Sequence, residues 1–108
     1  MANSTAQIFG LFELDTAGTV RYSKVDPRTS GIGSPADLIG RNFFDEFAAA
    51  EIQLRFRYFA NSSEAAEKFT YTCLNDRQPV EVKVLLTHIS QREYDAQEKL
   101  IIVDIRKV

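Results

Sequence analysis

Three segments in the second half of the chain alternate between apolar and polar residues, and this pattern constrains the fold more than any other feature. The clearest segment, 80–89, has one side made of Val80, Val82, Val84, Leu86 and His88. Successive side chains of a β-strand point to opposite faces, so this alternation predicts a strand with one buried face. Residues 68–74 and 100–108 repeat the pattern and predict two further strands.

The first half predicts a hairpin followed by short helices. Residues 8–15 and 19–23 alternate around the turn sequence at 15–18, with Val20 and Tyr22 expected on one face. Short helices are expected at 34–40, after the capping residue Asn42, and at about 51–62. The polar residues 91–98 predict a loop.

This order predicts an α+β domain in which short helices lie between strands two and three of a five-stranded antiparallel sheet and cover one of its faces. The buried face would carry Phe12, Leu14, Val20, Tyr22, Phe69, Tyr71, Val82, Val84, Val103 and Ile105. The helix aromatics Phe43, Phe44, Phe47, Phe56 and Phe59 would cover that face.

Composition fits one domain over residues 1–108, with residues 1–7 as a flexible tail. The chain has 108 residues, 44% of them hydrophobic, and a net charge of −2 without a basic cluster, which argues against nucleic-acid binding. The single cysteine, Cys73, excludes an internal disulfide and a cysteine-rich metal site. No signal peptide and no apolar run of the ~20 residues that a membrane span needs are present. We therefore expect a soluble, cytoplasmic protein with no metal.

Several stretches in this order resemble a PAS domain, and one branch in particular, that of photoactive yellow protein. They are FGLFELDTAGTVRYS, SPADLIGRNFFDEFA and FTYTCLNDRQPVEVKV. The likeness covers roughly residues 9 to 108. It implies the PAS fold and a sensory role, although PAS domains share a fold across many ligands and partners.

The resemblance also implies a ligand pocket, although its covalent anchor is missing. Photoactive yellow protein holds 4-hydroxycinnamate through a cysteine, and Ala50 falls at that position here. The candidate pocket residues are Tyr22, Asp26, Ser30, Phe44, Ala50 and Cys73. The pocket could have collapsed or could hold a noncovalent small apolar or aromatic guest. We favour collapse, and therefore no cofactor, because protein interiors close-pack.

Other chemistries find little support in the sequence. His88 is the one histidine, and PAS domains that bind haem typically use a histidine on a helix, which argues against haem. The flavin-binding motif of the PAS family is absent. No nucleophile–base pair or phosphate-binding loop is present, so we expect no enzyme.

Three aliphatic residues fall on the opposite side of the predicted sheet, among polar residues. They are Leu74, Leu85 and Ile102. An exposed apolar patch often marks an association site. We therefore expect a non-enzymatic sensory module that associates with a second copy or a signalling partner through this face. The alternative is a noncovalent small-molecule or chromophore receptor.

Overall fold

Strands dominate the computed structural model of the protein, which describes residues 9–25, 38–46, 50–75, 77–93 and 96–108. The elements in this part of the chain are β1 (Gly10–Asp15), β2 (Val20–Val25), α1 (Phe43–Glu46), α2 (Ala50–Ala60), β3 (Ala66–Asn75), β4 (Gln78–Glu93) and β5 (Ala96–Lys107).

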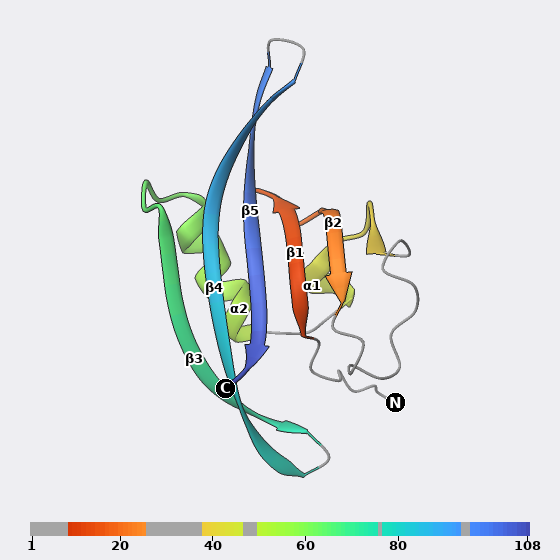
Figure 1. Ribbon diagram of the computed structural model, residues 1–108, viewed down its shortest axis with the longest axis vertical. Helices are drawn as coiled ribbons and strands as arrows, with labels where there is room; N and C mark the ends of the chain where they lie inside the picture. The colour runs from red at the N-terminus through yellow and green to blue at the C-terminus, as the bar shows by residue number, and fades with distance from the viewer. Residues whose placement is uncertain (1–8, 26–37, 47–49, 76, 94–95) are drawn as a thin grey trace.

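The strands form one antiparallel sheet in the order β2-β1-β5-β4-β3. Both helices lie on the same side of the sheet (Figure 1). We call this side the inner face and the opposite side the outer face. The predicted α+β class, with a five-stranded antiparallel sheet and short helices between the second and third strands, is confirmed.

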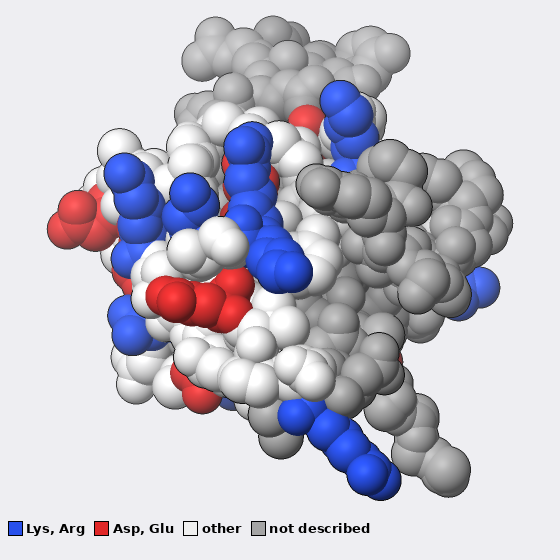
Figure 2. Space-filling model, turned by 60° about the horizontal axis from the view of Figure 1, so that its bottom comes forward, with Lys and Arg blue, Asp and Glu red and all other residues white. Residues whose placement is uncertain are grey.

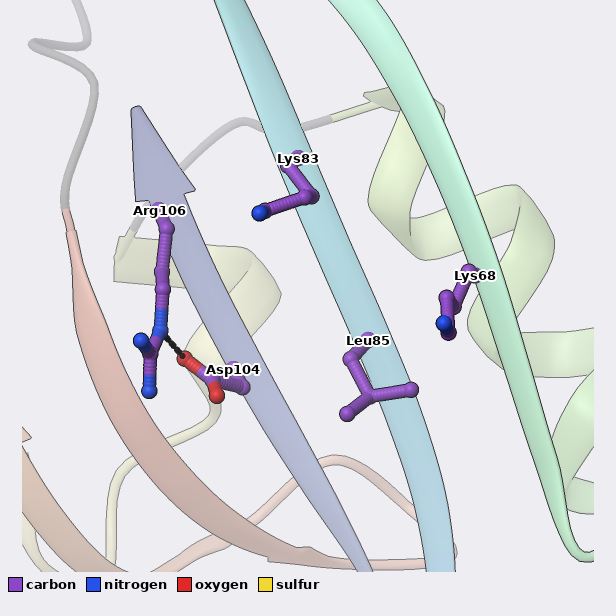
Figure 3. Close-up of a pocket in the computed structure, with 5 residues that line it drawn as sticks. All are labelled: Lys68, Lys83, Leu85, Asp104 and Arg106. Atoms are coloured by element: carbon purple, nitrogen blue, oxygen red, sulfur yellow. Dashed lines mark hydrogen bonds and ion pairs between the residues drawn. The ribbon is translucent and has the colours of Figure 1, made fainter. Parts of the chain in front are cut away.

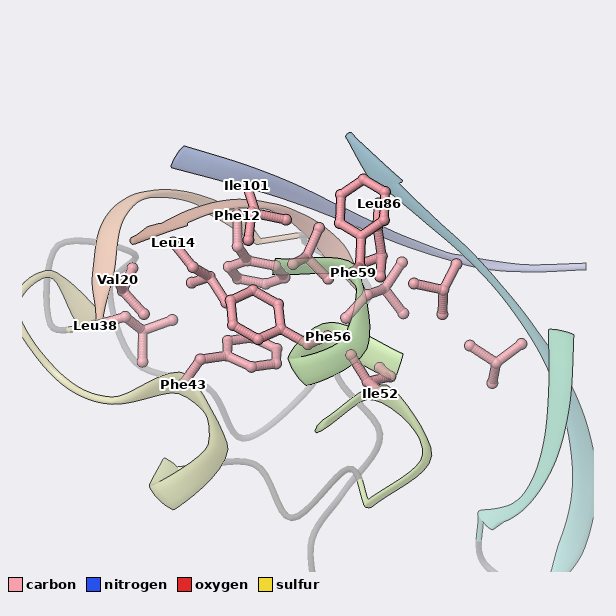
Figure 4. Packing of buried hydrophobic residues seen from close by; sticks show 14 residues of the cluster. Phe12, Leu14, Val20, Leu38, Phe43, Ile52, Phe56, Phe59, Leu86 and Ile101 are labelled. Atoms are coloured by element: carbon pink, nitrogen blue, oxygen red, sulfur yellow. The ribbon is translucent and has the colours of Figure 1, made fainter. Parts of the chain in front are cut away.

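Aromatic rings join the helices to the inner face. The ring of Phe43 in α1 lies 5.0 Å from that of Phe12 in β1 and 5.2 Å from that of Phe44. Phe44 in turn lies 5.0 Å from Phe56 in α2. The buried core around them contains Leu14, Val20, Leu38, Ile52, Phe59, Val82, Val84, Leu86, Ile101, Val103 and Ile105 (Figure 4). Large aromatic side chains contribute most to such cores because each buries a large apolar area.

The β1–β2 turn is tied to the start of α1. Gly18 has a φ of +95°, and a Cβ there would lie 3.0 Å from Cδ2 of Phe44. The backbone N–H of Phe43 donates to the carbonyl of Gly18 at 2.9 Å. The side chain of Asn42 accepts from the N–H of Phe44 at 2.9 Å and donates to the carbonyl of Ala17 at 3.0 Å. The prediction that Asn42 caps a helix is confirmed, and the same side chain fixes the turn.

One inward placement was wrong, that of Tyr22. The register of β1 and β2 shifts between Glu13 and Leu14, so that Leu14 pairs with Val20 but Glu13 pairs with Tyr22. Such a β-bulge inserts one residue, here Arg21, and reverses the alternation beyond it. Tyr22 therefore shares the outer face with Glu13 and is 46% exposed, while Ser23 is buried.

The predicted loop at 91–98 was also wrong. β4 continues to Glu93 and β5 begins at Ala96, with Gln91 paired to Glu98 and Arg92 to Gln97. A two-stranded ribbon forms its hydrogen bonds without a buried face, so hydrophobic alternation carries no signal for it. The third predicted helix is α2, whereas most of the helix expected at 34–40 and the side chain of Phe47 lie outside the described residues.

Candidate interaction site

Four of the six predicted pocket residues are described, and their surroundings differ. Phe44 is half-buried in the aromatic cluster, Ala50 is exposed at the start of α2, and Tyr22 lies on the outer face. Cys73 is half-buried in β3. Asp26 and Ser30 lie outside the described residues.

Side chains fill the space between the sheet and the helices where these residues are described. The contacts from Phe12 through Phe43 and Phe44 to Phe56 form a continuous series of rings. Ring contacts of this kind are typical of protein interiors. Whether a pocket is collapsed or holds a guest stays a prediction, because residues 26–37 and 47–49 lie outside the described part of the chain.

Cys73 behaves as a small apolar residue on the inner side of β3. It pairs with Val80 and packs against the core. Burial raises the pKa of its thiol, and this effect outweighs a hydrogen bond to its own backbone. A raised pKa keeps the thiol protonated and unreactive, which is the opposite of what a redox-active thiol needs.

His88 supports the structure at the end of α2. Its ring stacks on Phe59 at 4.1 Å with an interplanar angle of 14°. Its Nδ1 lies 2.7 Å from the backbone carbonyl of Glu64, so this nitrogen carries the proton and donates. No group of three or more possible metal-ligating side chains occurs among the described residues. In the same part of the chain no helix is long and apolar enough to cross a membrane.

The outer face carries the predicted aliphatic residues. Leu85 pairs with Asp104 on one side and Lys68 on the other, while Ile102 pairs with Thr87 and Glu13. Leu85 and Ile102 are thus diagonal neighbours on adjacent strands, and both are half-buried. The backbone of Leu74 pairs with Pro79 at the far end of β3, and its side chain lies outside the described part.

A shallow groove of about 270 Å³ lies on this face. It is lined by Lys68 from β3, Lys83 and Leu85 from β4, and Asp104 and Arg106 from β5. We call it the basic groove. Their side chains project from three neighbouring strands on the side away from the helices, with Leu85 between the charged groups (Figure 3).

The charges of the basic groove are unevenly matched. Nε of Arg106 contacts Oδ1 of Asp104 at 3.0 Å, and this hydrogen bond and ion pair raise the pKa of Arg106. Lys83 lies directly opposite Arg106 in the register. Two like charges facing each other across strands repel. In Figure 2, Lys and Arg side chains gather with a few Asp and Glu side chains over the end of the sheet that carries the C-terminus.

Sequence reasoning placed Leu85 among polar residues on this face but did not identify a cationic groove there. Lys68, Lys83 and Arg106 look like ordinary solvent-facing strand residues in the sequence. Only the cross-strand register brings Lys83 opposite Arg106 and Lys68 opposite Leu85. A correct strand alignment was the one signal that could have found them.

Comparisons with known proteins agree with this architecture. Solved structures that match the fold include the photoactive yellow protein domain of the sensor histidine kinase Ppr from Rhodospirillum centenum, the PAS-B domain of Drosophila melanogaster Cycle with bound ethylene glycol, and a PAS domain of an HTR-like protein from Haloarcula marismortui. Their TM-scores are 0.59, 0.57 and 0.54, at 21%, 12% and 19% identity. In the same order, the matches cover 93%, 93% and 92% of this chain. They cover 85%, 100% and 85% of the matched chains. The chain therefore has the PAS fold.

Sequence similarity narrows the class. The chain is 35% identical to photoactive yellow protein from Rhodothalassium salexigens over 81 residues. The match covers 70% of this chain and 64% of that relative, so it spans less than two thirds of the relative's length. No protein-family model matches the chain. The chain thus has the PAS fold and is similar in sequence to photoactive yellow protein, and it has alanine where the resemblance places the chromophore cysteine.

Proposed function

We propose that the protein is a non-enzymatic sensory module that passes its signal to another protein through the outer face of its sheet. The observation that carries this proposal is the placement of Leu85 and Ile102, half-exposed diagonal neighbours on adjacent strands. Leu11 of β1 and Ile89 of β4 share this outer register and are also half-buried, whereas Leu100 is buried. Aliphatic surface surrounded by polar side chains is typical of an association site.

The composition of the two faces supports the same proposal. On the inner face the aromatic cluster occupies the space next to the helices, which argues for a structural role there. The residues on the outer face that accompany Leu85 are charged and accessible, as in the rim of a transient interface. A signal would then reach the partner through changes in this sheet surface.

Sedimentation velocity of the intact chain over a range of concentrations tests the proposal. We expect Leu85→Asp with Ile102→Lys to abolish association while the circular dichroism spectrum stays native, because both changes place charges in a desolvated contact. The control pair is Leu54→Asp with Tyr58→Lys, which alters exposed residues of α2. Self-association that persists unchanged in the outer-face variant would contradict the proposal.

A further inference from the structure

The basic groove contains more positive than negative charge, although the chain as a whole has a net charge of −2. Among the described residues that line it, three are cations and one is an acid. That single acid, Asp104, is already paired with Arg106. Glu81, the next outward residue of β4, is an additional acid beside the groove but does not line it.

Two of the cations have no counter-charge in the described structure. The side chains of Lys68 and Lys83 form no hydrogen bond or ion pair with a described residue. Both side chains are exposed, and the paired strands hold their backbones in a fixed register. A partner that supplies carboxylates here would relieve the repulsion between Lys83 and Arg106.

From this arrangement we infer that the basic groove binds an acidic segment of a partner protein that places an aliphatic side chain on Leu85 and carboxylates beside Lys68 and Lys83. This inference rests on the proposed function, because it names the partner chemistry of the same face. The aliphatic contact provides burial, and the carboxylates provide orientation and a faster encounter.

A second copy in a symmetric face-to-face arrangement suits the groove less well. In a contact where the groove meets its own counterpart, Lys68, Lys83 and Arg106 of one copy would face the same cations of the other. Like charges brought together at an interface cost free energy and disfavour that partner. The charge pattern therefore favours an acidic segment of another protein in the basic groove itself, and self-association through the outer face would have to keep the two grooves apart.

Two synthetic amphipathic peptides test this inference on the intact chain. Both have leucines along one helical face. The remaining positions are glutamate in one peptide and lysine in the other. Amide chemical shifts of the ¹⁵N-labelled protein are recorded at low ionic strength during titration with each. We expect the glutamate peptide to perturb the amides of β3, β4 and β5 around the groove, and the lysine peptide to leave them unchanged. Added salt should weaken the glutamate complex.

Charge reversal locates the site. Lys68→Glu with Lys83→Glu leaves the Arg106–Asp104 pair intact and should weaken the glutamate peptide about tenfold, since each exposed ion pair contributes up to about 1 kcal/mol. The matched control, Arg57→Glu with Lys99→Glu, makes the same charge change at exposed positions outside the groove and should leave affinity unchanged.

Equal binding of both peptides would overturn the inference, and so would equal weakening by the groove variant and the control variant. Absence of binding by the glutamate peptide would also overturn it. Sedimentation of the Leu85→Asp, Ile102→Lys variant separates this failure from that of the proposed function. If that variant loses self-association while neither peptide binds, the outer face remains an interface but its partner is a second copy.

Discussion

The two faces of the same sheet differ in almost every physical property. The inner face is apolar, covered by helices and crossed by rings in mutual contact. The outer face exposes lysines and an arginine around a half-buried leucine. Since both faces are built from the same strands, one residue step along a strand separates a stabilising position from one available for recognition.

The difference separates stability from specificity. Inner-face side chains lose solvent on folding, so their contribution appears in the free energy of unfolding. Outer-face side chains that stay accessible in the folded protein can be selected for what they bind. Mutations on the two faces should therefore change different measurements.

The largest expected effect is on the inner side. Phe43→Ala removes a fully buried ring that contacts Phe12 and Phe44, and it should lower the free energy of unfolding by about 3–5 kcal/mol. Urea denaturation measures this loss. Tyr58→Ala, an exposed aromatic of α2, is the control and should change stability by no more than about 0.5 kcal/mol. Similar losses for both would mean that the ring cluster is not the core.

Two glycines allow a comparison between a closely packed backbone position and one with open space around it. Gly18 and Gly40 both have positive φ, so alanine at either costs about 1–2 kcal/mol of conformational strain. At Gly18 the new Cβ would also lie 3.0 Å from Phe44, which adds about 1–3 kcal/mol, whereas nothing lies within 4 Å at Gly40. Thermal or urea unfolding should show that the Gly18→Ala variant is less stable than the Gly40→Ala variant. The reverse order of stability would exclude the proposed contact with Phe44.

The Asn42 side chain connects the turn to the helix layer, and its loss should have a smaller effect. Asn42→Ala removes the cap on Phe44 and the bond to the carbonyl of Ala17, which should cost about 1 kcal/mol. Asn42→Asp keeps the acceptor and should recover most of the loss. Equal stability of the alanine variant and the unmodified protein would show that the cap is dispensable.

The smallest expected effect is the pH dependence of stability caused by Cys73. In the unfolded chain the thiol ionises at its ordinary pKa, whereas burial raises the pKa in the folded protein. The contribution is thus fully present below the ordinary cysteine pKa and is lost as pH rises through the raised value. Urea midpoints should fall more steeply over this alkaline range than those of Cys73→Ser. Identical slopes would indicate that the thiol is not desolvated.

Much of the fold was predictable because its strands follow the alternation of apolar and polar residues. Residues 80–89 lie within β4, and the helix expected at 51–62 is observed as Ala50–Ala60. In each case a local preference and the burial pattern agreed, so the sequence was sufficient.

The missed features depend on pairing between strands. The bulge at Arg21 places the side chain of Tyr22 on the outer face instead of the inner face. No feature of residues 19–23 alone predicts this bulge. The extension of β4 to Glu93 depends on its partner strand. The basic groove likewise exists only because β3, β4 and β5 align in one register. Features that depend on the pairing of distant segments could therefore not be predicted from the sequence.

The most direct test of the contrast between the two faces compares neighbouring leucines of β4 by urea denaturation. Leu86 is fully buried on the inner face, whereas Leu85 is half-buried on the outer face. We predict that Leu86→Ala lowers the free energy of unfolding by about 2–5 kcal/mol, and that Leu85→Ala lowers it by less than about 1 kcal/mol. Equal losses at the two positions would contradict the assignment of one face to stability and the other to recognition.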